Sequence, residues 1–571
     1  MTEPATEPQA AHRGLSASVP GIAMLRSYRA SWLRPDLVAG IVLAAILVPQ
    51  GLAYAELAGV PAVTGLYTTI ACLVAYALMG PSRVLVLGPD SSVSPLIFAA
   101  IVPLMAGGSD PATAIALAGM LALLVGAIEI GLGIGKLGFV ADLLSKEVQV
   151  GYMNGLAVTI VVGQLPKLFG FSTDANGFLA EVKAFVTGLD QTSLVTLALG
   201  VATLAVLFLL PRLTRRVPAV LVAVVGAIVV TAVFGLADHG VKTVGTLPQG
   251  LPVPKFPWTG WGDVPDLTIA ALGIVLVSLA DTIATSTSFA ARRGDEVDPN
   301  QEMIGVGSAN VAAGLFQGFA VSVSGSRTAV ATEAGAKTQV TGLVGAGVVM
   351  LVLVLIPGLF RNLPNTALAA VVIAAAFSLA DVRVLKTYWR VRRSSFLLSL
   401  TATLGVILLG VLQGIVIAVV LSIFLFFRRS WWPPGEVLGY DAGLDGWHDL
   451  KRHPDAEQIP GVIVYRWEAP LFFANAGMFR QQIRRLARRE HPRWIVLQCE
   501  AVTDIDLTAA DVLKRLDLEL NAQGVHFAFA ELRTRLRDLV LRYGLLETLD
   551  RDHFYPSLRQ AVEEIRREEG D

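Results

Sequence analysis

Charged residues are scarce in this chain. They make up 16% of its 571 residues, whereas 54% are hydrophobic, and ordinary soluble domains carry about 25% charged residues. The deficit is local: residues 37–428 are almost all apolar runs, while 430–571 have the composition of a soluble domain. We therefore expect a short segment over 1–36, a membrane domain over 37–429, and a linker with a compact domain over 430–571.

Other absences exclude whole classes of function. Two cysteines, Cys72 and Cys499, cannot build a disulfide framework, and no histidine falls within an apolar run. No H-E-x-x-H, P-loop or G-x-S-x-G motif occurs, and G-I-G-K-L-G at 133–138 only links two apolar runs. The net charge of −1 gives no basic field for a nucleic-acid partner. We expect neither an enzyme nor an ATP-driven motor, and no cleaved signal peptide in the first 35 residues.

Fourteen segments are candidates for membrane crossings. They lie at 37–57, 62–79, 84–104, 112–134, 138–168, 192–211, 217–236, 266–290, 301–320, 322–332, 338–357, 364–380, 395–409 and 411–428. With both termini in the cytoplasm, eighteen Lys and Arg residues fall in inside loops and five in outside loops, namely Lys167, Lys183, Lys242, Lys255 and Arg361. This positive-inside bias places the C-terminal domain in the cytoplasm.

The third and tenth segments are short and broken by polar residues. One opens with G-P-D-S-S-V-S-P (88–95) and the other with S-V-S-G-S-R-T (322–328). They hold the third place in each of two sets of seven, about 37–236 and 266–429, and an odd-numbered repeat must enter the membrane inverted. Interrupted segments at matching places of inverted halves indicate a transporter's binding site.

Residues 48–67, V-P-Q-G-L-A-Y-A-E-L-A-G-V-P-A-V-T-G-L-Y, resemble the signature of the sulfate permease (SulP) family of anion transporters. The resemblance continues through S-R-V-L-V-L-G-P (82–89), V-G-Q-L-P-K-L-F-G (162–170) and S-G-S-R-T-A-V (324–330), and ends in a tail similar to a STAS domain. It implies a polytopic helical fold with a seven-plus-seven inverted repeat, divided into core and gate domains, and a cytoplasmic α/β STAS domain. It also implies a homodimer in the cytoplasmic (inner) membrane.

The family resemblance assigns the anion site to the starts of two half-helices, which carry partial positive charge. It implies that Ser91, Ser326 and Arg327 belong to this site, with Gln50 and Tyr54 lining the substrate cavity. From the residues alone, Arg327 could instead tie helix ends together through carbonyl groups. Asp90, also expected among the substrate-binding residues, departs from the family pattern. It caps the half-helix, takes up a proton when substrate binds, or indicates a less usual substrate.

The resemblance also implies that Asp281 binds the coupling ion, with Thr285 one turn further on. A buried carboxylate can carry a proton, and with a hydroxyl partner it can hold Na⁺; a third alternative is an ion pair with Arg327. No other cofactor is expected. Glu129, in the fourth segment, is expected to pack in the gate domain or at the lipid interface.

The expected function is secondary transport of a small anion of the sulfate, bicarbonate or dicarboxylate class, with elevator-like movement coupled to H⁺ or Na⁺. The alternatives are an uncoupled anion exchanger and an anion-sensing signalling protein that acts through the STAS domain. At 506–509 the tail reads D-L-T-A, where related domains carry a phosphorylatable serine in D-S-S-G. Because Leu507 replaces that serine and only Thr508 keeps a hydroxyl, phosphorylation control is not favoured.

Overall fold

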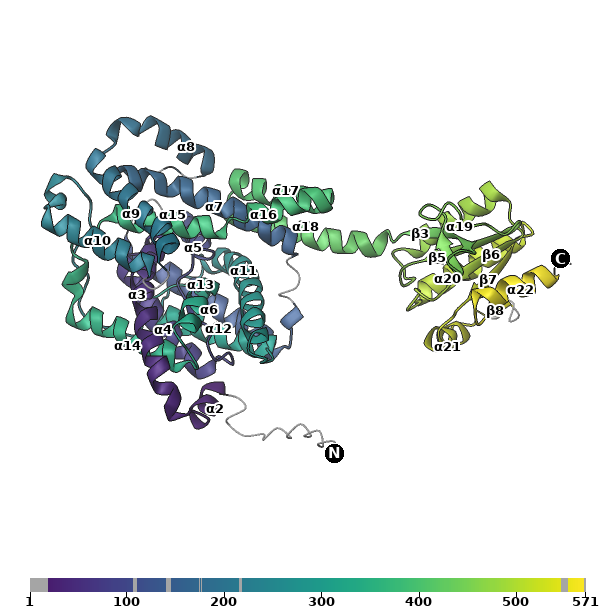
Figure 1. The fold of residues 1–571 in the computed structure, drawn as a ribbon, viewed down its shortest axis with the longest axis horizontal. Coiled ribbons are helices and arrows are strands. Elements are labelled where there is room, and N and C mark those ends of the chain that lie inside the picture. Colours follow the sequence, from purple (N-terminus) through teal and green to yellow (C-terminus); the bar gives the residue numbers. More distant parts are fainter. Residues whose placement is uncertain are drawn as a thin grey trace. The chain divides into compact units, whose positions relative to one another are not determined.

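The structure, a computed structural model, describes residues 19–105, 110–139, 145–173, 175, 177–214, 218–545 and 553–568. The chain divides into two compact units, Met1–Ser422 and Ile423–Asp571 (Figure 1). The division falls inside helix α18 (Val411–Trp431), a few residues before the end expected for the membrane domain.

The first unit is mostly helical. Each of the fourteen expected segments contains a helix, and described stretches also include the short helices α2 (Pro20–Arg26), α8 (Phe178–Thr187) and α16 (Val382–Val391). The helices in the expected segments are α3 (Leu33–Leu57), α4 (Ala62–Met79), α5 (Ser94–Ile101), α6 (Pro111–Ile134), α7 (Lys146–Phe169), α9 (Leu194–Leu213), α10 (Ala219–Val233), α11 (Val264–Ala291), α12 (Pro299–Leu315), α13 (Gly325–Glu333), α14 (Val340–Leu355), α15 (Asn365–Leu379), α17 (Arg393–Leu409) and α18. Within the described residues, seven helical stretches are long and apolar enough to cross a membrane, and five shorter apolar helices accompany them.

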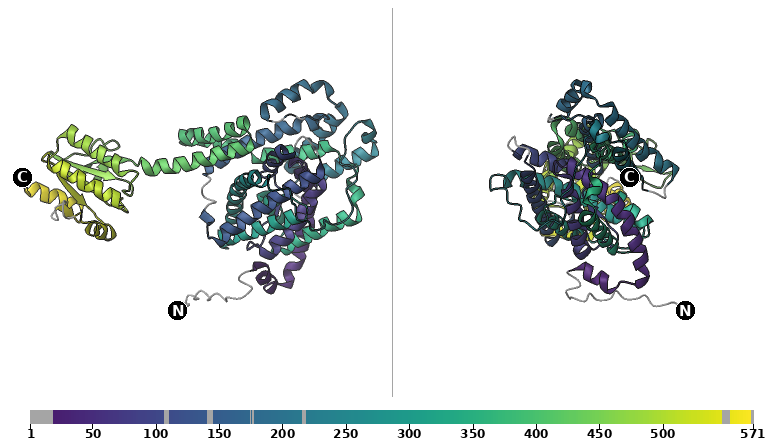
Figure 2. Two further views of the ribbon diagram at one scale, coloured as in Figure 1. Left: turned by 180° about the vertical axis from the view of Figure 1, so that it is seen from behind. Right: turned by 90° about the vertical axis from the view of Figure 1, so that its left-hand side faces the viewer.

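Helix pairs in this unit occur in matched sets, as an inverted repeat requires. Helix α6 packs on α12, and the equivalent pair in the repeat is α14 on α4. Likewise, α3 packs on α14, and the equivalent pair is α11 on α6. When the fourteen expected segments are numbered in chain order, moving each helix of a pair by seven places gives the equivalent pair. Early and late helices consequently interleave in space and do not form two separate halves (Figure 1, Figure 2).

The helices also form two packing groups. Helices α3, α4, α6, α11, α12 and α14 contact one another, and so do α7, α9, α10, α15 and α17. The first group corresponds to the core domain and the second to the gate domain. Helix α3 touches α10 and α15, so it lies where the two groups meet.

Glycine allows close helix approach in the core group. A Cβ atom added to Gly126 on α6 would lie 2.5 Å from the carbonyl oxygen of Gly307 on α12, and one added to Gly307 would lie 2.8 Å from that of Gly126. Gly119 lies seven residues before Gly126 on α6, and Gly314 lies seven residues after Gly307 on α12. These two glycines make the same kind of contact. Close backbone contact of this kind is typical of helix packing in membranes.

The third and tenth segments are each a short strand followed by a half-helix. Strand β1 (Leu87–Gly88) precedes α5, and β2 (Ser322–Val323) precedes α13. The two strands pair antiparallel, Leu87 opposite Val323 and Gly88 opposite Ser322. Unsatisfied backbone groups are costly inside a membrane. The pairing gives backbone groups of both extended stretches a hydrogen-bond partner. It also brings the starts of the two half-helices together.

The second unit is a layered α/β domain. Its six strands have the order β4-β3-β5-β6-β7-β8. They are β3 (Gly435–Asp441), β4 (Gly446–Asp449), β5 (Val462–Trp467), β6 (Trp494–Gln498), β7 (His526–Ala530) and β8 (Phe554–Tyr555). Strands β5 to β8 pair in parallel, and β3 pairs antiparallel with β4 and β5.

Both faces of this sheet are covered by hydrophobic packing. Ile463 and Tyr465 of β5 belong to a cluster with α19 (Ala476–Glu490), α20 (Leu507–Asn521) and α21 (Thr534–Arg542). The alternate residues Val462 and Val464 belong to a cluster with α22 (Leu558–Glu568). This alternation follows from the two-residue period of a strand. The apolar runs at 461–467, 494–499 and 526–532 contain β5, β6 and β7, and residues 479–489 and 507–520 lie within α19 and α20.

Candidate functional site

The two half-helix starts face one cavity of about 740 Å³. Seven of the eight residues named from the sequence line it, together with Gln149, Ser324, Gly325 and Asp381. These seven are Gln50, Tyr54, Asp90, Ser91, Asp281, Thr285 and Ser326. The wall opposite includes Leu207 of α9 and Val371 and Ser378 of α15, so the cavity lies between the core and gate groups.

Serine residues shape the start of α13. Ser324 is its N-cap, and its hydroxyl accepts a hydrogen bond from the backbone N–H of Arg327 at 3.5 Å. The Ser324 hydroxyl also lies 3.2 Å from that of Ser326. On the other side, Ser324 N–H donates to the carbonyl of Val86, which ties this cap to β1. The hydroxyls of Ser324 and Ser326 therefore sit at the cavity surface on a helix start fixed by its neighbours.

Arg327 lies behind the cavity surface and does not line it. Its side chain is 1% exposed. One terminal nitrogen, Nη1, donates to the carbonyl of Pro89 at 2.5 Å, and Nη2 donates to that of Gly88 at 3.3 Å. Nη2 also lies 3.5 Å from Oδ2 of Asp90. Arg327 of the tenth segment thus holds the extended stretch of the third segment, an arrangement the sequence left open as its structural alternative.

Asp90 is the acid that pairs with Arg327, although 237 positions separate them in sequence. Its Oδ1 accepts hydrogen bonds from the backbone N–H of Ser92 at 3.0 Å and from the Ser92 hydroxyl at 2.8 Å. Its carbonyl accepts from the N–H and the hydroxyl of Ser94. Val93 holds the N-cap position of α5 and makes no side-chain cap. Asp90 therefore stabilises the turn that precedes α5. It lies three residues before the N-cap position and does not cap the helix itself.

Asp281 and Thr285 occupy one face of α11, beside the two half-helices. Oδ1 of Asp281 accepts a hydrogen bond from Nε2 of Gln149 on α7 at 2.9 Å. Thr285 lies against the start of α13, since a Cβ atom added to Gly325 would be 3.8 Å from its Oγ1. Asp281 makes no ion pair with Arg327, whose acid is Asp90. No sequence signal identifies Gln149, because a glutamine inside an apolar helix has no distinctive spacing.

The carboxylate and hydroxyl of this pair are oxygen ligands of the kind that Na⁺ prefers. No group of three or more His, Cys, Asp or Glu side chains able to hold a metal occurs among the described residues.

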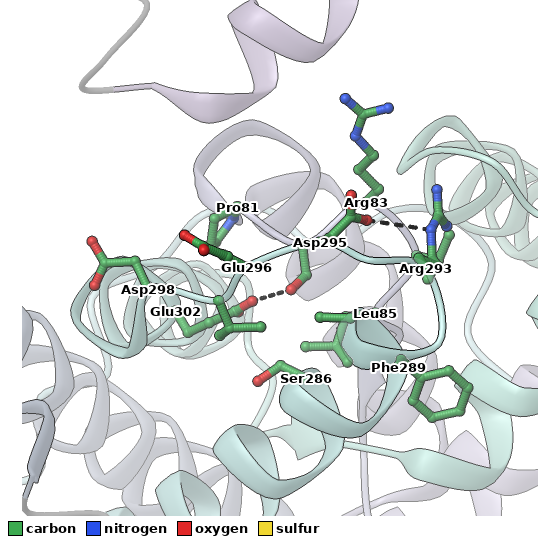
Figure 3. Close-up of a pocket in the computed structure, with 14 residues that line it drawn as sticks. Pro81, Arg83, Leu85, Ser286, Phe289, Arg293, Asp295, Glu296, Asp298 and Glu302 are labelled. Atoms are coloured by element: carbon green, nitrogen blue, oxygen red, sulfur yellow. Dashed lines mark hydrogen bonds and ion pairs between the residues drawn. The ribbon is translucent and has the colours of Figure 1, made fainter. Parts of the chain in front are cut away.

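A second, smaller cavity of about 210 Å³ lies at the C-terminal end of α11 (Figure 3). Ser286 lines it, whereas the adjacent Thr285 lines the larger cavity. Its wall includes an ion pair of 3.4 Å between Arg293 and Asp295. The carboxylate of Glu302 accepts hydrogen bonds from Tyr76 at 2.6 Å and from Ser82. None of the residues named from the sequence lines this cavity.

Glu129 differs from its sequence expectation. It is fully buried on α6 and accepts hydrogen bonds from Ser278 of α11 at 3.0 Å and from Asn310 of α12 at 2.8 Å. The Asn310 side-chain oxygen in turn accepts from the N–H of Val321, just before β2. Glu129 therefore belongs to the interior of the core group, and not to the gate domain or the lipid interface.

In the second unit, the D-L-T-A segment opens α20. Asp506 is the N-cap and accepts a hydrogen bond from the N–H of Ala509 at 2.7 Å. Leu507 is 63% exposed, and Thr508 is also exposed. The position that carries serine in related domains is thus accessible but has no hydroxyl.

Comparisons with known proteins agree with this arrangement. The sequence profile of the sulfate permease family matches residues 33–402, and that of the STAS domain matches 453–561. A probable sulfate transporter of Mycobacterium tuberculosis (strain CDC 1551 / Oshkosh) is 41% identical over 96% of this chain and 98% of its own.

Solved structures share the fold. The murine Slc26a9 anion transporter in the inward-facing state matches with a TM-score of 0.87 at 24% identity, over 98% of this chain and 96% of its own. The transmembrane domain of the cyanobacterial bicarbonate transporter BicA matches with a TM-score of 0.61 at 23% identity, over 69% of this chain and 98% of its own. The chain therefore belongs to the sulfate permease family: it is a membrane transporter of anions, not an enzyme, and it carries a C-terminal STAS domain.

Proposed function

We propose that this protein is a secondary active transporter of a small anion of the sulfate, bicarbonate or dicarboxylate class, coupled to H⁺ or Na⁺. The observation that carries the proposal is the convergence of two half-helix starts on one cavity. A helix start presents unpaired N–H groups and roughly half a positive charge. Two of them bind an anion without a cluster of formal charges that would be costly inside a membrane.

The anion would lie among the residues at these helix starts. Ser91 and Ser326 supply hydroxyl and N–H donors, Gln50 supplies amide donors, and Tyr54 an aromatic wall with a phenolic O–H. The charge of Arg327 acts from behind the surface, beside Asp90. The names of the relatives support this class of substrate, since one is called a sulfate transporter and another a bicarbonate transporter.

Transport would proceed by an elevator-like movement of the core group against the gate group. Most of the polar site residues lie on α3, α11 and the two half-helix segments, whereas Leu207 and Val371 lie on gate helices. A cavity bounded in this way changes its exposure when one group slides past the other. Coupling is assigned to Asp281 with Thr285, which adjoin the start of α13.

The cellular arrangement belongs to the same proposal. The positive-inside bias supports a multi-pass protein of the cytoplasmic (inner) membrane with both termini and the STAS domain in the cytoplasm. The transport domain would occupy 37–429, and the linker with the STAS domain 430–571. A homodimer is proposed from family resemblance.

Uptake by the purified protein in proteoliposomes tests the proposal. Labelled sulfate, bicarbonate and fumarate are offered under an imposed proton or sodium gradient, to the wild type and to Asp281→Asn. We expect gradient-driven uptake of at least one anion, and loss of the gradient dependence in Asp281→Asn because the amide cannot carry a proton or neutralise Na⁺. Asp266→Asn changes an exposed acid on the same helix and should behave as wild type.

Two outcomes would contradict parts of this proposal. If Asp281→Asn keeps the full gradient dependence, Asp281 is not the coupling residue. If wild-type uptake requires an exchanged anion inside the vesicle and ignores both cation gradients, the protein is an uncoupled exchanger.

A further inference from the structure

Asp90 and Arg327 form a charge pair that bridges the two half-helix segments at the anion cavity. Asp90 lines the cavity and its side chain is 13% exposed, whereas Arg327 is 1% exposed and does not reach the lining. An anion in the cavity therefore meets the carboxylate of Asp90 before it meets the guanidinium. With Asp90 ionised, the nearest formal charge opposes substrate binding.

The charges around the cavity do not accommodate a divalent anion while its acids are ionised. The two helix starts contribute about one positive charge in total, and Arg327 contributes one more. Asp90 and Asp281 remove two, so the net charge of these groups is close to zero before an anion enters. The third cavity acid, Asp381, is exposed and screened by solvent, and it adds no positive charge. Sulfate would then carry the site to about −2 in a low-dielectric environment, where uncompensated charge is costly.

Arg327 is fixed independently of Asp90. Its hydrogen bonds to the carbonyls of Gly88 and Pro89 involve both terminal nitrogens and do not depend on the carboxylate. The Asp90 side chain is also held by Ser92 through Oδ1, which leaves Oδ2 as the oxygen that faces the guanidinium. A proton added to Oδ2 would neutralise the acid while both side chains keep their positions. The arginine's charge would then act on the anion.

We propose that Asp90 is a proton acceptor of the anion site, whose protonation releases the charge of Arg327 to the substrate and so links proton uptake to anion binding. The inference rests on the proposed function and deepens it. One proton from the aqueous cavity adds to Oδ2 of Asp90, the carboxyl group becomes neutral while it stays beside Arg327, and the anion supplies the negative charge that the proton removed. By linkage, the anion strengthens proton binding to Asp90 as much as the proton strengthens anion binding.

Other titratable groups near Asp90 define the alternatives. Tyr54 faces the cavity from α3, and Tyr152 of α7 donates from its hydroxyl to the carbonyl of Ser92 at 3.3 Å. The acids on the same cavity are Asp281 of α11 and Asp381, which caps α16 through the N–H of Val384. Of these three cavity acids, Asp90 is the one that pairs with a cation among the described residues, and therefore the one whose neutralisation frees a positive charge.

Calorimetry counts the protons directly. Sulfate is titrated into the purified full-length protein in buffers of different ionisation enthalpy, and the dependence of the heat on the buffer gives the protons taken up per anion bound. We expect proton uptake in the wild type, and a decrease of up to about one proton per anion in Asp90→Asn. The asparagine keeps an acceptor for Ser92, so the turn before α5 should be retained. Sulfate affinity in this variant should be higher at alkaline pH and less dependent on pH than in the wild type.

Two controls separate Asp90 from its neighbours. Asp90→Glu keeps the acid and should keep the proton uptake. Asp381→Asn removes a cavity carboxylate that has no arginine partner in the described part of the chain, and asparagine still caps a helix, so its proton uptake should match the wild type. Asp281→Asn reports how much of the uptake belongs to the coupling residue already proposed.

The outcomes distinguish this inference from the proposed function. Undiminished proton uptake in Asp90→Asn, or an equal decrease in Asp381→Asn, overturns the inference and leaves anion transport intact. If the wild type binds sulfate without taking up protons, the inference is likewise overturned and anion transport is left intact. If neither sulfate, bicarbonate nor fumarate binds or is transported by the wild type, the proposed function fails and the inference fails with it.

Discussion

At the scale of single residues, Arg327 shows what a sequence can and cannot predict. Its place beside a broken segment indicates a site, because an arginine among apolar runs needs a partner. Its partners are Asp90 and two carbonyl groups of a segment about 240 positions away, and no local pattern identifies them. Gln50, Tyr54 and Asp281 could be named from motifs, whereas Gln149 and the buried network of Glu129 required the fold.

Removal of Arg327 should destabilise the first unit through its buried partners. Arg327→Met leaves two carbonyls and a carboxylate without their donor, at a cost of about 3–5 kcal/mol. In the double variant Arg327→Met/Asp90→Asn, part of this cost should be recovered, with an interaction energy of about 0.5–3 kcal/mol. Unfolding in mixed micelles measures all four proteins of the cycle. Additive effects of the two substitutions would show that the pair does not interact energetically.

At the scale of elements, the length of the apolar runs and the Gly, Pro and polar residues that interrupt them predicted the helices well. Every expected segment contains a helix, and the Gly- and Ser-rich runs match the two strand–half-helix segments. Among the described residues, seven helical stretches are long and apolar enough to cross a membrane. The buried strands β5, β6 and β7 were recognisable for the same reason. Strands β3 and β4 were missed because their side chains are mostly half-buried and mixed in polarity. The amphipathic α16 was hidden between two apolar segments.

The contact between α6 and α12 gives a prediction at this scale. Gly126→Ala places a methyl group about 2.5 Å from the Gly307 carbonyl oxygen, so the two helices must separate. Gly131→Ala on the same helix meets nothing within 4 Å and serves as the matched control. We expect the first variant to lose about 1–3 kcal/mol of stability by overpacking, and the control to lose none. Equal melting temperatures in detergent would contradict a tight α6–α12 interface.

At the scale of the whole molecule, the two units have separate cores and separate chemistry. The hydrophobic cluster of the first unit shares no residue with the two clusters of the second. Every residue that lines the anion cavity lies between Gln50 and Asp381. The sequence predicted this division from composition alone, because the long apolar runs end near residue 428 and residues 430–571 have the composition of a soluble domain.

This separation predicts that transport survives loss of the STAS domain. A chain that ends at Arg429 should take up sulfate into proteoliposomes with the same gradient dependence as the full-length protein, because its cavity and helix packing are complete. Trp467→Ala provides the matched control in the intact chain: this tryptophan is fully buried in the second unit, and its loss costs about 3–5 kcal/mol there. It should unfold the STAS domain at a lower temperature and leave uptake unchanged. Loss of uptake in both proteins, with the first unit still folded, would show that the STAS domain is required for transport itself.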